Sequence, residues 1–81
     1  MYQTVNEEIE VLGVYSHSRF VPKKFKWNSR VFLIKEITIF NDVRDGLIKK
    51  RLYSVLSGVN LYRIEFNRES ERWKILEVWC D

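Results

Sequence analysis

Hydrophobic and polar residues alternate along most of this chain, with the period of two that is typical of β-strands. The clearest stretch is Leu61–Phe66, in which apolar Tyr62 and Ile64 alternate with Arg63 and Glu65. Similar alternation predicts further strands over Glu8–Tyr15, Phe20–Trp27, Arg30–Phe40 and Arg72–Trp79. Short polar or glycine-containing segments separate these stretches, so we expect tight turns between antiparallel neighbours.

The most apolar and most β-rich segment runs from Phe25 to Phe40. We expect it to form the central hairpin of the fold, with a tight turn at Asn28 and Ser29. Asparagine suits such a turn because it tolerates positive φ. Before the turn, Phe25 and Trp27 share one parity, whereas Lys24 and Lys26 share the other. This arrangement predicts apolar side chains facing inward and cationic side chains facing outward.

The second half of this hairpin interrupts the alternation. Phe32 and Ile34 share one parity, whereas Ile37 and Ile39 share the opposite one. An extra residue near Lys35–Glu36 would return both pairs to the inner face, so the pattern predicts a β-bulge within one long strand. A strand that is buried on both faces is the alternative.

Residues 47–57 fit two kinds of secondary structure. Ile48 and Leu52 have helical spacing, whereas Tyr53 and Val55 alternate as they would in a strand. Glycine-containing turn signals flank the segment on both sides, as they do in a hairpin. We therefore predict a strand here, with a helix as the alternative.

These elements predict a single all-β domain over residues 1–81. The expected architecture is an antiparallel meander of about five to six strands, curled into a small SH3-like barrel. Residues 1–7 are expected to form a loosely ordered N-terminal extension. Gly13 predicts a bend or bulge, and the parity of Val78 predicts a register slip near Leu76–Glu77.

The length of 81 residues leaves room for only one hydrophobic core, and the composition (46% hydrophobic, 31% charged) is that of a folded globular domain. Cys80 is the only cysteine, so an internal disulfide is excluded. The first residues do not resemble a signal peptide, and the apolar runs are far too short to span a membrane. We expect a cytoplasmic protein with no membrane contact.

The charge is unevenly distributed. The net charge is +3, and the stretch from Val11 to Lys35 contains basic residues but no acidic ones. Such asymmetry is typical of a nucleic-acid surface, although the wet face of a sheet has the same composition. The candidate nucleic-acid-binding residues are Arg19, Lys23, Lys24, Lys26, Arg30, Lys49, Lys50 and Arg51. The candidate base-stacking residues, which flank the strands, are Tyr15, Phe20 and Trp79.

The sequence offers no catalytic constellation. His17 is the only histidine and lies far from Cys80, so no nucleophile–base pair is indicated. The spacing required for a zinc site is absent, and so is a glycine-rich phosphate loop. Asp42 and Asp45 precede Gly46 in a turn whose spacing does not match an EF-hand. We therefore predict a protein that is not an enzyme and that uses no cofactor and no metal.

The chain resembles an uncharacterised family of small bacterial all-β domains through a set of spaced core positions. In this chain they are Phe25, Trp27, Phe32, Ile34, Ile37, Tyr53, Val55, Gly58, Tyr62, Ile64, Trp73, Ile75, Val78 and Trp79. The resemblance covers most of the chain from Phe20 onward and implies the fold more than the function. Some members are encoded near translesion DNA polymerases, which implies an accessory role in DNA transactions and a DNA polymerase or another protein as a partner.

Together these features lead us to expect a small β-barrel module that binds nucleic acid or assists DNA repair. The alternative is a protein-interaction module that acts through a sheet edge or through the aromatic residues near the C-terminus.

Overall fold

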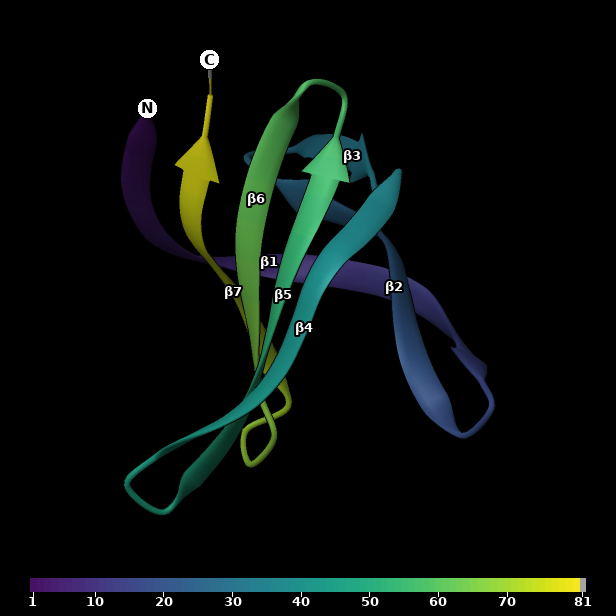
Figure 1. Ribbon diagram of the computed structural model, residues 1–81, viewed down its shortest axis with the longest axis vertical. Coiled ribbons are helices and arrows are strands. Elements are labelled where there is room, and N and C mark those ends of the chain that lie inside the picture. The colour runs from purple at the N-terminus through teal and green to yellow at the C-terminus, as the bar shows by residue number, and fades with distance from the viewer. Residues whose placement is uncertain (81) are drawn as a thin grey trace.

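The computed structural model describes residues 1–80, which form one antiparallel sheet of seven strands (Figure 1). The order of the strands in the sheet is β3-β2-β1-β7-β6-β5-β4. Within these residues there is no helix of the length and apolarity needed to cross a membrane. Because all seven strands pair antiparallel in one sheet, the predicted all-β antiparallel fold is confirmed. The strands are β1 (Tyr2–Ser16), β2 (Arg19–Trp27), β3 (Arg30–Leu33), β4 (Glu36–Asp45), β5 (Ile48–Ser57), β6 (Asn60–Asn67) and β7 (Arg72–Trp79).

The sheet is curled but open, so the predicted closed barrel and the lower strand count are wrong. The difference arises at Ile34 and Lys35, where one strand with a bulge was predicted. The chain instead leaves the sheet there, and β3 and β4 become its two opposite edges. The Ile34 amide donates to the Lys23 carbonyl (2.9 Å), and the Lys35 amide donates to the Leu56 carbonyl (2.7 Å). These two bonds tie the connection between β3 and β4 to β2 and β5, but β3 and β4 do not pair with each other.

The predicted central hairpin consequently supplies the two edges of the sheet and not its centre. The interruption still places Phe32, Ile34 and Ile37 against the core, as the parity argument required. Ile39 was also predicted to face inward, but it is exposed. A register shift between Ile37 and Ile39 turns Phe40 inward in its place.

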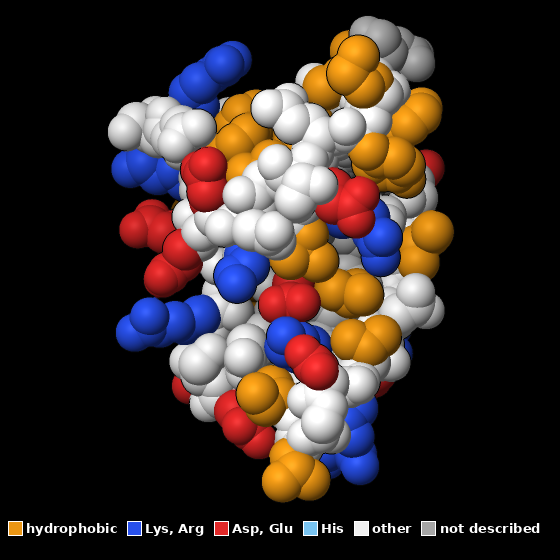
Figure 2. Space-filling view, turned by 90° about the vertical axis from the view of Figure 1, so that its left-hand side faces the viewer, with side chains coloured by type: hydrophobic (Ala, Val, Ile, Leu, Met, Phe, Trp, Pro, Cys, Tyr) orange, Lys and Arg blue, Asp and Glu red, His pale blue; other side chains and the backbone are white. Residues whose placement is uncertain are grey.

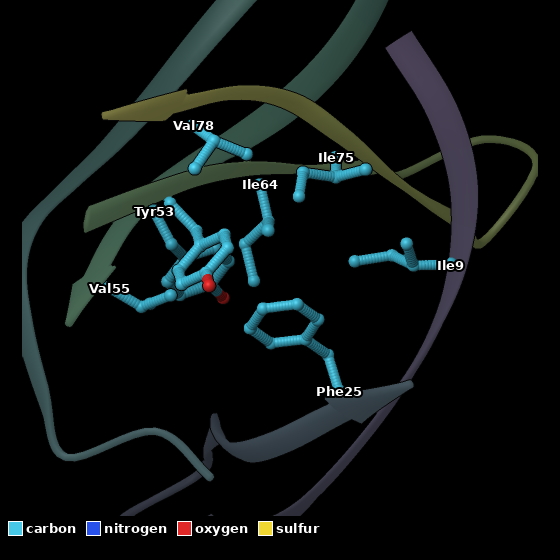
Figure 3. Close-up of a cluster of buried hydrophobic side chains, with 8 residues drawn as sticks. Ile9, Phe25, Tyr53, Val55, Ile64, Ile75 and Val78 are labelled. Atoms are coloured by element: carbon cyan, nitrogen blue, oxygen red, sulfur yellow. The ribbon is translucent and has the colours of Figure 1, made fainter. Parts of the chain in front are cut away.

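The core lies on the concave side of the curled sheet and joins its two halves (Figure 3). Phe25 reaches from β2 toward Ile64 and Tyr53, and Ile9 enters from β1. Phe25 stacks on Phe32 with ring centroids 5.0 Å apart. The buried hydrophobic residues of the core are Ile9, Phe25, Tyr53, Val55, Tyr62, Ile64, Ile75 and Val78.

Several local predictions are confirmed. Residues 48–57 form β5, so the strand interpretation of this segment is correct. Asn28 and Ser29 form the two-residue turn between β2 and β3, and both have positive φ (52° and 62°). This is the geometry of a type I′ hairpin turn. The β6–β7 pairing skips Leu76, which is the predicted slip.

Gly13 lies at a second irregularity, where the β1–β2 register shifts between Leu12 and Gly13. A Cβ at this position would collide with the Val21 carbonyl oxygen and would lie 2.8 Å from Phe20 Cζ. The close approach of the two strands therefore requires glycine. It also brings Phe20 into position for the cleft described below.

The N-terminal residues belong to the sheet. Residues 1–7 were predicted to form a loosely ordered extension, whereas in the structure β1 begins at Tyr2 and its first part pairs with β7. The amino group of Met1 donates to the Cys80 carbonyl (2.7 Å). The two chain ends therefore lie side by side (Figure 1).

Candidate functional site

The hairpin between β1 and β2 presents two aromatic rings at one end of the concave face. Its two-residue turn, His17–Ser18, has positive φ at both positions (53° and 63°), and this geometry pairs Tyr15 directly with Phe20. The two rings meet edge to face with centroids 5.4 Å apart. Tyr15 is 79% exposed, which is unusual for a large ring on the concave side of a small sheet.

Tyr15 and Phe20 form the rim of a cleft of about 180 Å³, which we call the aromatic cleft. Its wall is a continuous run of rings from four strands. Phe20 lies 5.9 Å from Trp73, and Trp73 lies 5.4 Å from Tyr53 and 4.8 Å from Phe66. The lining residues are Tyr15, Ser18, Phe20, Arg51, Tyr53, Phe66 and Trp73.

Two arginines flank this run of rings at Phe40, which itself packs against Tyr53. The guanidinium carbon of Arg19 lies 4.7 Å from the Phe40 ring centroid, and that of Arg51 lies 5.7 Å from it. Arg51 Nε also donates to Asp42 Oδ1 (2.9 Å). Arg19 forms no ion pair with any residue in the described part of the chain, so its charge remains available to a ligand.

Tyr53 forms the floor of the cleft. Burial raises the pKa of its phenol above the usual value of 10.0, and the positive charge of Arg51 offsets this effect only in part. The group therefore stays neutral at physiological pH and keeps its proton. The floor can thus supply a neutral hydroxyl, and the positive charge at the rim comes from the arginines.

The other predicted cations are divided between the two faces of the sheet. Lys24 and Lys26 pair with Leu33 and Val31 on β3, on the face opposite Phe25. They are exposed and lie away from the aromatic cleft, as expected for cations on the wet side of a strand. Lys23 is the residue that the β1–β2 register skips, and it is also exposed.

The basic group of β5 is divided in the same way. Lys50 makes ion pairs with Asp45 (3.5 Å) and Glu65 (3.7 Å), so its charge is neutralised. Lys49 and Arg51 lie on the other face of β5, which is the face that carries Tyr53, and Lys49 is exposed. These two side chains therefore extend from the aromatic cleft along β5.

Arg30 and Trp79 lie away from the aromatic cleft. The guanidinium carbon of Arg30 lies 5.5 Å from the Phe32 ring, at the far end of β3. Trp79 meets Tyr2 edge to face, with centroids 4.6 Å apart, where the two chain ends pair. Of the three candidate stacking residues, the structure brings together Tyr15 and Phe20.

Four aromatic residues of this site were absent from the sequence-based candidates: Tyr53, Phe66 and Trp73, which line the cleft, and Phe40, which packs beside it. Tyr53 and Trp73 were among the core positions that carry the family resemblance, and both side chains pack toward the core. Their exposure to a cleft depends on how far the β1–β2 hairpin stands from β5, which no local pattern encodes. The available signal was Tyr15 and Phe20 on either side of a short polar turn.

On the face shown in Figure 2, basic and acidic side chains are interspersed with hydrophobic ones. Residues 1–80 also contain no group of three or more His, Cys, Asp or Glu side chains placed to hold a metal ion. Comparison with family models, curated proteins and solved structures gives no match for this chain.

Proposed function

We propose that this chain is a non-enzymatic module that binds single-stranded nucleic acid in the aromatic cleft. The observation that carries the proposal is the exposed ring of Tyr15, which ends a continuous run of rings beside the unpaired Arg19. Proteins that bind single strands combine aromatic faces for the bases with cations for the phosphates. The aromatic cleft has both.

Each side chain then has a distinct role. Tyr15 and Phe20 stack on a base at the rim of the cleft. Arg19 binds the neighbouring phosphate, and Arg51 and Lys49 continue the cationic track along β5. Arg51 remains held by Asp42, which orients its guanidinium and reduces its net contribution.

The small size of the aromatic cleft favours a single strand over a duplex. A volume of about 180 Å³ suits one unstacked base and is far too small for a base pair. Bases are available for stacking only where they are unpaired, as in single strands and loops. A role as a DNA-repair accessory, which the family resemblance implies, is compatible with such a ligand because repair exposes single-stranded DNA.

Fluorescence anisotropy with a labelled oligothymidylate tests this proposal. We expect binding at low salt that is tighter than binding to a duplex of the same length. With about three phosphates contacted, log K should fall with log salt with a slope of about −2. Absence of binding to any single strand at low salt would contradict the proposal, and so would equal affinity for the duplex.

A protein-interaction module is the second candidate. It is favoured by exposed apolar side chains on the outer face of β1 and β3, namely Leu12, Val31 and Leu33. Exposed apolar groups of this kind are typical of contact surfaces. Capture of a DNA polymerase or repair partner by the intact chain, lost in a Leu12→Ser, Leu33→Ser double variant, would support this candidate.

A further inference from the structure

We propose that two copies of this chain pair through their β4 strands, antiparallel and centred on Val43, to form one continuous sheet. β4 is a ten-residue edge strand with no neighbour on its outer side. Its distal half, together with β5, extends beyond the rest of the sheet (Figure 1). Unpaired edges of this length are templates for another strand.

The register of the β4–β5 hairpin determines which backbone groups are free. Asp45 and Ile48 flank a two-residue turn, so this pair is hydrogen-bonded. Successive opposed pairs alternate between hydrogen-bonded and non-hydrogen-bonded. The amide and carbonyl groups of Asp42 and Arg44 therefore point away from β5 and are available to a second strand.

One antiparallel register satisfies these free groups and the charges together. If Val43 lies on the twofold axis, Asp42 faces Arg44 of the second copy in a hydrogen-bonded pair, and the reciprocal pair forms by symmetry. Two opposite-charge pairs result. Opposite charges directly across two strands stabilise the pairing, whereas like charges destabilise it.

The apolar side chains match in the same register. Val43 meets its own counterpart in a non-hydrogen-bonded pair, the arrangement in which facing side chains are closest. Ile39 is placed opposite Leu47 of the second copy. In the single chain these three residues are 37%, 53% and 89% exposed, respectively, and the pairing would cover all of them.

The electrostatic environment of Arg44 also favours this partner. Arg44 lies directly opposite Lys49, which is an unfavourable like-charge pair. Among residues 1–80, neither cation makes an ion pair. Asp42 is more than half exposed despite its contact with Arg51, so it can accept a second cation. The carboxylate of a second copy would supply the missing negative charge at Arg44.

A cross-linking experiment tests the register. In a Cys80→Ser background, Val43→Cys places two thiols across the twofold axis, where the Cα atoms are about 4.5 Å apart and within disulfide range. Asn41→Cys is the matched control, because the two copies of this position lie four residues out of register, roughly 14 Å apart. We expect rapid oxidation to a disulfide dimer for Val43→Cys only. Equal cross-linking of the two variants would overturn the register.

Charge exchange tests the pairing without new covalent bonds. Arg44→Asp and Asp42→Arg each create like-charge pairs, so each variant alone should remain near the monomer mass of 9.9 kDa. A mixture of the two restores both opposite-charge pairs and should form a heterodimer. Circular dichroism of each variant establishes that it is folded.

Light scattering over roughly a hundredfold range of protein concentration provides the readout. The unaltered chain and the mixture should approach twice the monomer mass, while the separate variants should not. A monomeric unaltered chain at every concentration would overturn the proposal, as would a dimer that both charge variants retain.

Discussion

Replacing Phe25 with alanine is expected to remove a large share of the stability of this protein. The ring is 1% exposed, stacks on Phe32 and meets Tyr62 edge to face at 5.2 Å. It therefore joins β2 and β3 to β6 across the concave side. Truncation of a buried Phe costs about 3–5 kcal/mol, against a total stability of about 5–15 kcal/mol for a typical domain. Urea unfolding followed by circular dichroism measures the loss.

Leu33→Ala provides a matched control in the same hairpin. Leu33 belongs to β3 like Phe32 but faces outward and is 69% exposed. Its truncation should change the free energy of unfolding by no more than about 0.5 kcal/mol. Comparable losses for Phe25→Ala and Leu33→Ala would mean that the concave face does not hold the two halves of the sheet together.

The alternation of residue types was sufficient to predict the fold class and most of the strands. The interruption between Ile34 and Ile37 was also visible as a change of parity. A bulge within one strand and a crossing between two edges both produce that change, however, because parity reports only which face a side chain occupies. Which of the two occurs depends on contacts remote in sequence, such as the bond from the Lys35 amide to the Leu56 carbonyl.

Replacing Tyr15 with alanine is expected to weaken binding of single-stranded DNA by a factor of about 5 to 150. This range corresponds to the loss of one base–aromatic stacking contact, about 1–3 kcal/mol. Stability should change little, because Tyr15 is largely exposed and contacts chiefly Phe20. Anisotropy titrations at one low salt concentration measure the change in affinity.

Tyr15→Phe separates stacking from hydrogen bonding. It retains the ring and removes only the hydroxyl, so its affinity should stay within about threefold of the unaltered chain, a difference of about 0.7 kcal/mol. A loss in Tyr15→Phe as large as that in Tyr15→Ala would assign the effect to the hydroxyl. Unchanged affinity in both variants would remove Tyr15 from the interface.

The candidate site was less predictable than the fold. Lys49, Lys50 and Arg51 are consecutive in sequence and were grouped as one basic cluster. In a strand, consecutive side chains point to opposite faces, and Lys50 is neutralised by Asp45 and Glu65. Conversely, Arg19 and Arg51 are distant in sequence but meet at Phe40. The curl of the sheet brings these two arginines together, and the spacing of residues along the sequence does not reveal it.

The most direct test of nucleic-acid binding in the aromatic cleft is a titration of the isotope-labelled chain with oligothymidylate at low salt, followed through amide and indole chemical shifts. We expect shifts concentrated at Tyr15, Ser18, Phe20, Arg51 and the Trp73 indole, around the aromatic cleft. Amides on the outer face, such as those of Leu12 and Leu33, should be unaffected. Shifts centred on that outer face, or no shifts at all, would contradict binding in the aromatic cleft.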